Sequence, residues 1–171
     1  SIGINQPTTF ALYRIGRCHY KLGNNDLALS YFIQTIEEDP IHDKAWMSIA
    51  IIYYNKNDFN ESKNNLLKAL EIDSDKIKYW ELYAKINVKI DNFEEVELAI
   101  KEILSLGKLD VNTLTFLTQT LIKIPENESL IKGLLKSINL FPKSAENEIN
   151  YLLSAIYFKI LDNENAISHL K

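Results

Sequence analysis

The feature that most constrains this chain is a hydrophobic pattern that recurs at a constant interval along the sequence. Trp46, Ile49, Ala50 and Tyr53 are spaced at i, i+3, i+4 and i+7, so they share one face of a helix. The same spacing begins again at Trp80, and the separation of Trp46 from Trp80 defines the interval. Further copies begin one interval away on either side, at Leu12 and Leu114, and a fifth copy, out of step by two residues, contains Tyr151.

A second pattern follows each copy, and it pairs a small or apolar residue with a larger apolar residue four positions later. Polar breaks such as residues 55–58 separate the two patterns, so each copy predicts a helix, a short turn and a second helix. One such helix pair cannot bury its apolar faces alone, and we expect the copies to pack side by side. The pairs are Ala28 with Phe32, Ser62 with Leu66, Val96 with Ile100, Leu130 with Leu134, and Ala166 with Leu170.

This combination resembles the tetratricopeptide repeat, which has a period of about 34 residues, the pattern Trp-x2-Leu-Gly-x2-Tyr, a later Ala-x3-Phe and a closing Pro. Pro40 and Pro142 stand at the closing position. The resemblance covers residues 9–171 and implies an all-α fold, an α-solenoid wound as a right-handed superhelix of about five helix–turn–helix repeats. We predict a lead-in at residues 1–8 and one array with repeats at 9–42, 43–76, 77–110, 111–144 and 145–171, the last incomplete.

Residues at the expected helix ends suit helix capping. Thr8 or Thr9 is expected to cap the first helix, and Asp43 the third. Gly107 is expected to end a helix as its C-terminal cap. The last repeat shows no polar cap for its apolar face, so we expect the parent protein to continue past Lys171.

Composition narrows the function classes. An all-helical chain is favoured, because there are only 5 Gly and 4 Pro and no alternating strand pattern. The net charge of −4 does not favour a protein that binds nucleic acid. No apolar run reaches membrane-spanning length, and a single cysteine excludes an intrachain disulfide. There is no Gly-rich phosphate loop and no Gly-x-Ser-x-Gly motif, and the histidines His19, His42 and His169 lie far apart.

We therefore predict no catalytic, metal or cofactor site. His19 is interpreted as a ring that packs in the core, and Cys18 as a small buried apolar residue, with a reactive thiol as the alternative. Trp46 and Trp80 are interpreted as core residues. The cellular compartment stays open, with the cytoplasm favoured.

In the family that this chain resembles, the first helices of successive repeats line the concave surface. Offsets −2, +1, +2, +5, +8 and +9 from the Trp position are helically spaced and define what we call the groove stripe. Nine of its members are basic and two acidic. The basic ones are Arg14, Arg17, Lys21, Lys44, Lys78, Lys85, Lys89, Lys123 and Lys159, and the acidic ones are Glu81 and Glu148. Its aromatic members are Phe10, Tyr13, Tyr20, Tyr54, Phe116, Tyr151 and Phe158, and Ser48, Ile51 and Leu82 belong to it too.

These residues predict a non-enzymatic protein-interaction scaffold that binds an acidic peptide with apolar anchors, without nucleic acid or membrane. We expect Arg14, Arg17, Lys85 and Lys89 to contact carboxylates. The predicted contact residues are the nine basic members of the groove stripe together with Tyr13, Tyr20, Tyr54, Phe116 and Tyr151.

Several alternatives stay open. The lysines are also explained as an ordinary solvated face. The chain is also compatible with a regulatory repeat domain of a larger, catalytic protein, or with an array that self-associates through its uncapped C-terminal repeat. A chaperone-tail adaptor is disfavoured, because only Lys78 matches in kind the carboxylate clamp that some family members carry. The other clamp positions hold Tyr13, Arg17, Ser48 and Leu82.

Overall fold

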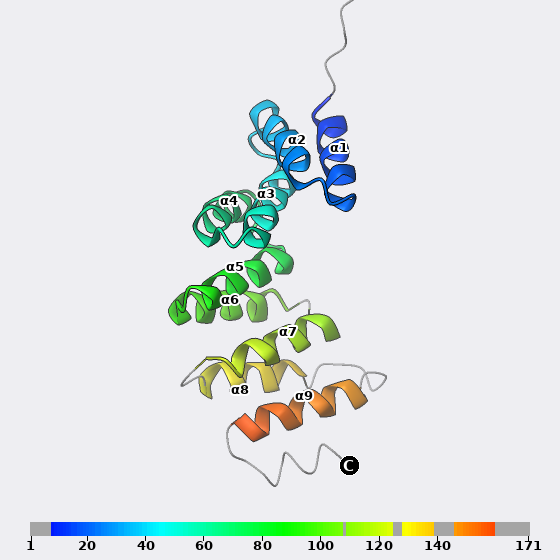
Figure 1. Ribbon diagram of the computed structural model, residues 1–171. Coiled ribbons are helices and arrows are strands. Elements are labelled where there is room, and N and C mark those ends of the chain that lie inside the picture. The colour runs from blue at the N-terminus through cyan, green and yellow to red at the C-terminus, as the bar shows by residue number, and fades with distance from the viewer. Residues whose placement is uncertain (1–7, 108, 125–127, 139–145, 160–171) are drawn as a thin grey trace, which may run out of the picture. The chain divides into compact units, whose positions relative to one another are not determined.

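The computed structural model describes residues 8–107, 109–124, 128–138 and 146–159, and every regular element among them is an α-helix (Figure 1). The helices are α1 (Thr9–Lys21), α2 (Asn25–Glu38), α3 (Asp43–Asn55), α4 (Phe59–Ile72), α5 (Ile77–Lys89), α6 (Phe93–Leu106), α7 (Val111–Leu121), α8 (Glu128–Ile138) and α9 (Glu146–Lys159). The predicted all-α architecture of helix pairs is therefore confirmed.

The chain divides into two compact units, Ser1–Leu82 and Tyr83–Lys171, with the boundary inside α5. In the first unit, α1 packs on α2, α2 on α3 and α3 on α4. In the second unit, α6 packs on α8, while α9 packs on both α7 and α8. Each unit thus consists of stacked helices of similar length.

The two tryptophans show that the period of the sequence pattern is structural. The indole Nε1 of Trp46 donates a hydrogen bond to the carbonyl of Pro40, at 2.8 Å. The indole Nε1 of Trp80 donates to the carbonyl of Ser74, also six residues earlier and also at 2.8 Å. Both indoles are half-buried and make the same bond across the preceding loop, so the two positions are equivalent.

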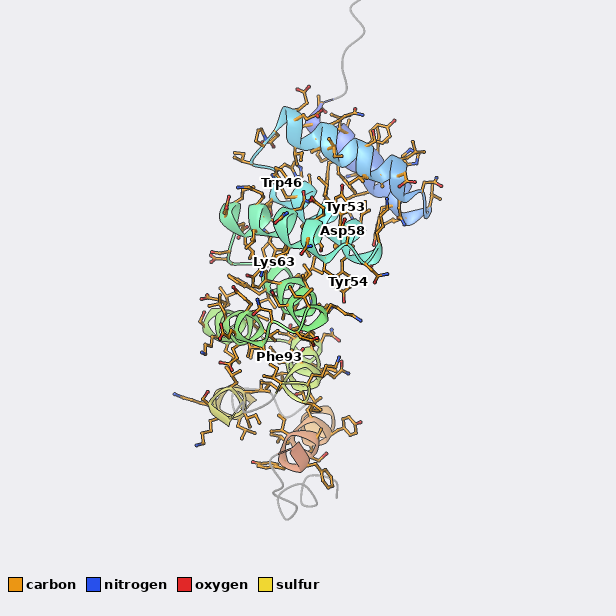
Figure 2. All side chains as sticks on the ribbon, turned by 60° about the vertical axis from the view of Figure 1, so that its left-hand side comes forward. Trp46, Tyr53, Tyr54, Asp58, Lys63 and Phe93 are labelled. Atoms are coloured by element: carbon orange, nitrogen blue, oxygen red, sulfur yellow. The ribbon has the colours of Figure 1, made fainter. Side chains whose placement is uncertain are left out.

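The turns inside the helix pairs repeat as well. Gly23, Asn57 and Asp91 occupy the same position in successive copies of the pattern, and each has a positive φ, of 81°, 61° and 55°. Gly, Asn and Asp are the residues that adopt this left-handed conformation most readily. Asp58 and Asn92 then cap α4 and α6, since their side chains accept from the backbone N–H of Glu61 and Glu95. Figure 2 labels Asp58 where α4 begins, and Tyr53 and Tyr54 near the end of α3.

The other helix caps are more varied. The Thr8 hydroxyl accepts from the N–H of Ala11, as expected, and Gly107 ends α6 with a φ of 64°. The expectation that Asp43 caps α3 is wrong. His42 is the cap, and its ring Nδ1 accepts from the N–H of Ala45 at 3.1 Å. Asp43 is already the first residue of the helix, where its carboxylate is favourable to the helix dipole.

The small-and-large pairs form the core within each unit. Ala28 and Phe32 of α2 cluster with Ile49 and Ile52 of α3, and all four are at most 1% exposed. The equivalent residues Ser62, Leu66, Val96, Ile100, Leu130 and Leu134 are buried too. Ala166, Leu170 and Pro142, which were predicted to complete the pattern, lie outside the described residues.

A charged network ties the start of α3 to the start of α5 inside the first unit. The Asp43 carboxylate accepts from the Tyr79 hydroxyl at 2.5 Å and from the Lys76 ammonium at 2.9 Å. Lys76 also pairs with Asp73. Burial raises the pKa of Asp43, but the hydrogen bonds from Tyr79 and Lys76, with the Lys76 charge, hold it below its usual value. The ionised carboxylate therefore stabilises the fold.

The first prediction concerns Gly16, whose place in α1 leaves no room for a methyl group. A Cβ there would lie 2.7 Å from the ring of Phe32. Alanine gains about 1 kcal/mol of helix propensity over glycine, and overpacking costs about 1–3 kcal/mol. We expect Gly16→Ala to lower the free energy of unfolding by about 1 kcal/mol net.

Both tryptophans lie in the first unit, so urea unfolding followed by their fluorescence measures this change there. The double variant Gly16→Ala/Phe32→Leu should lose less unfolding free energy than the two single variants lose together, because the smaller Leu frees space for the added methyl group. A Gly16→Ala protein more stable than wild type would contradict the tight contact.

The second prediction concerns Asp43. Because its pKa is lowered in the fold, its stabilisation is present above the unfolded-state pKa and is lost as pH falls through the folded-state pKa. We expect Asp43→Asn to cost about 1–2 kcal/mol at pH 7, and the gap to wild type to narrow below about pH 4. Asp75→Asn is the matched control, since Asp75 is exposed and its carboxylate has no partner among the described side chains. An equal loss in both variants, or a gap that does not change with pH, would refute this role of Asp43.

Candidate functional site

A hollow in the first unit lies between α1, α2 and α3. It has a volume of 260 Å³ and an open mouth. Such a volume lies below the range of pockets for drug-sized ligands and suits a single large side chain. We call it the α1–α3 pocket. Its lining residues are Arg17, Tyr20 and Lys21 of α1, Phe32 of α2, and Ser48 and Ile51 of α3.

Helical spacing places these side chains together. Arg17, Tyr20 and Lys21 stand at i, i+3 and i+4 on α1, and Ser48 and Ile51 at i and i+3 on α3. The Asn55 amide at the end of α3 donates to the Tyr20 hydroxyl at 3.1 Å. This bond between α1 and α3 fixes the phenol at the pocket wall.

The rim of the pocket carries exposed cations. Arg14, Arg17 and Lys21 form no ion pair with the side chains that the structure describes, and all three are exposed. They surround a second, smaller hollow of 110 Å³ together with Cys18. The Arg17 guanidinium lies 5.9 Å from the centre of the Tyr13 ring, which keeps it near the pocket. The arrangement suits a carboxylate beside an apolar group.

Two tyrosines of the predicted site serve mainly as packing. The Tyr13 ring lies 5.6 Å from that of Phe32 and 4.6 Å from that of His42. The Tyr54 ring lies 5.6 Å from that of Phe59, and burial raises the pKa of Tyr54. Both are half-buried. Lys44 is exposed at the start of α3 and lines neither hollow.

The groove stripe is interrupted on α5. Lys78 donates to both carboxylate oxygens of Glu81 at 3.0 Å, so its charge is paired within the helix. Glu81 and Leu82 are buried rather than exposed, which corrects their assignment to an open stripe. This part of the predicted surface offers no free cation at Lys78.

The second unit holds the remaining predicted residues. The Lys85 ammonium lies 5.3 Å from the centre of the Phe116 ring, so α5 and α7 bring a cation and an aromatic together. Lys89, Lys123 and Tyr151 are exposed. The side chain of Lys159 lies outside the described part of the chain. Which of these residues contact a partner remains a prediction.

Two residues near the site, Phe32 and Cys18, differ from their predicted places. Phe32 was assigned to the core only, yet its ring also lines the α1–α3 pocket. The expected burial of Cys18 is wrong, because the thiol is exposed. The expected packing of His19 is confirmed, since its ring stacks on Tyr31 with centres 5.5 Å apart. Helical spacing alone did not tell which face of α1 has a neighbour.

The described residues offer neither a metal-binding cluster nor a membrane-spanning helix. No group of three or more His, Cys, Asp or Glu side chains there is placed to hold a metal ion. No helix there is both long and apolar enough to cross a membrane.

The third prediction follows from the corrected position of Cys18. We expect this thiol, the only one in the chain, to react completely with a disulfide reagent such as DTNB in the native protein. The rate should not rise in urea below the unfolding transition, because no opening is needed for access. A thiol that reacts only after unfolding would contradict the exposed position.

Comparison with known proteins agrees with this architecture. Residues 19–86 match the family model of the tetratricopeptide repeat. A curated relative, the Essential for maintenance of the cell wall protein 1 of Saccharomyces cerevisiae, is 25% identical over 139 residues. That match covers 75% of this chain and 15% of the relative, so the chain spans only a small part of the relative's length.

Two solved structures share the fold. YrrB, described as a tetratricopeptide repeat protein with an unusual peptide-binding site, is 15% identical with a TM-score of 0.71, covering 97% of this chain and 84% of YrrB. The first such domain of Spaghetti (RPAP3), bound to the HSP90 peptide SRMEEVD, is 16% identical with a TM-score of 0.61. The match covers 70% of this chain and 95% of that domain. The matched family model, the stacked helix pairs and the equivalent indoles of Trp46 and Trp80 agree that residues 19–86 of this chain form tetratricopeptide repeats.

Proposed function

We propose that this chain is a non-enzymatic scaffold that binds a partner peptide at the α1–α3 pocket. The peptide would place an apolar side chain in the pocket and a neighbouring carboxylate against Arg17 and Lys21. The observation that carries this proposal is the pairing of an apolar hollow of 260 Å³ with two cations that no described side chain neutralises. Tetratricopeptide repeat domains generally bind proteins or peptides and are typically non-catalytic, which supports a binding role.

The pocket chemistry favours an acidic peptide with an apolar anchor. Phe32 and Ile51 provide apolar walls, and burying one large apolar side chain contributes about 1.5–3 kcal/mol. The guanidinium of Arg17 is suited to a carboxylate because its N–H groups match the two oxygens.

The relatives support a peptide as the ligand class, since YrrB is described with a peptide-binding site and the Spaghetti domain holds an HSP90 peptide. A chaperone tail remains disfavoured for this chain. At the positions of the carboxylate clamp, the Lys78 charge is paired with Glu81, and Leu82 is buried. The regulatory domain and the self-associating array remain predictions from the sequence.

The fourth prediction tests the pocket with labelled peptides in fluorescence anisotropy. The probe is a pentapeptide with a central Phe flanked on both sides by Glu and Asp, and its control carries Gln and Asn instead. We expect Arg17→Glu to weaken binding of the acidic probe by about tenfold, which equals about 1.4 kcal/mol. Added salt should weaken it as well, because the rim charges are exposed.

Lys68→Glu is the matched control, because it makes the same charge change on an exposed helix position outside the pocket. It should leave the affinity near the wild-type value. Circular dichroism establishes that both variants are folded. If both variants bind as wild type does, or if the neutral peptide binds as tightly as the acidic one, the proposed pocket is wrong.

A further inference from the structure

We propose that the anchor of the partner peptide is a tyrosine, whose hydroxyl is recognised at the wall of the α1–α3 pocket by Tyr20 and Ser48. Both residues line the pocket, and both are half-buried. This inference rests on the proposed function, because it names the side chain that the pocket takes. It also goes further, since apolar walls alone do not distinguish tyrosine from phenylalanine. The argument comes from the direction of two hydrogen bonds.

The Tyr20 hydroxyl keeps its hydrogen free for a ligand. The side-chain amide of Asn55 donates to the Tyr20 oxygen at 3.1 Å. An amide N–H₂ group can only donate, so the phenol is the acceptor in this bond. The bond therefore fixes the position of the phenol without using its hydrogen. On the α1 side, the pocket offers a neutral hydrogen-bond donor.

The Ser48 hydroxyl has the opposite polarity. It donates to the backbone carbonyl of Lys44 at 2.7 Å, one helical turn earlier. A carbonyl can only accept, so this bond uses the single hydrogen of the hydroxyl. The Ser48 oxygen still has lone pairs, and the short side chain keeps it at the wall. On the α3 side, the pocket therefore offers an acceptor.

No other lining side chain can accept a hydrogen bond from a ligand. Arg17 and Lys21 only donate, and Phe32 and Ile51 are apolar. Ser48 is thus the acceptor that a polar anchor would use, and Tyr20 is the neutral donor beside it.

The hydroxyl of a tyrosine anchor matches this donor and acceptor. It can donate its hydrogen to Ser48 and accept the hydrogen of Tyr20. Its ring suits the apolar walls, and the volume of 260 Å³ suits one large side chain. Asn and Gln also donate and accept, but they lack the apolar ring. A phenylalanine would displace water from both polar groups and leave them without partners, which costs free energy.

The experiment compares two labelled pentapeptides by fluorescence anisotropy with the 171-residue chain. One is the acidic probe with the central Phe, and the other has Tyr in place of that Phe. We expect the Tyr peptide to bind about fivefold tighter, which corresponds to about 1 kcal/mol and is typical of a hydrogen bond in a partly buried site.

Three protein variants assign this preference to the pocket wall. Ser48→Ala removes the acceptor, and Tyr20→Phe removes the donor. Each should lower the ratio of the two affinities to about twofold or less. Ser30→Ala is the matched control, because it makes the same change at an exposed position on α2 that does not line the pocket. The ratio should keep its wild-type value there. Because both peptides carry the same charges, the rim contacts cancel in the ratio.

The possible failures separate this inference from the proposed function. Equal binding of both peptides to the wild-type chain, still weakened by Arg17→Glu, would exclude the tyrosine anchor and leave the peptide site in place. A preference for Tyr that survives Ser48→Ala and Tyr20→Phe would also exclude it, because the hydroxyl would then be bound elsewhere. An equal loss for both peptides in Ser48→Ala would assign Ser48 to the peptide backbone instead. If neither peptide binds, the proposed function fails together with this inference.

Discussion

The helix pairs depend on one small residue in each first helix. Gly16, Ala50, Ala84 and Thr118 occupy this position in successive repeats, and all are buried. At Gly16 the reason is measurable, because the Phe32 ring of the second helix lies where a Cβ would be. Only small side chains let two helices approach this closely. The close approach brings Phe32 within reach of Ile49 and Ile52, so the contact inside one pair also builds the contact to the next.

The proposed binding pocket comes from positions that this packing does not use. Phe32 fills the space between α1 and α3 only in part, and the remainder is the α1–α3 pocket. Tyr13 and Tyr54 belong to the same helix faces as the pocket residues, but their rings are held by His42 and Phe59. The framework therefore provides the apolar walls of the pocket, and the exposed cations Arg17 and Lys21 at its rim are the groups on which the proposed preference for an acidic ligand rests.

Sequence patterns predicted the elements well because the signals are local. Thr8 and Gly107 were identified as caps from residue type and position alone. The errors concern contacts between elements. Cys18 has the helical position of a core residue but is exposed, because no described helix covers that face of α1. Glu81 has the position of a groove residue but is buried, in a pair with Lys78. Burial depends on neighbours distant in sequence, which spacing within one helix does not reveal.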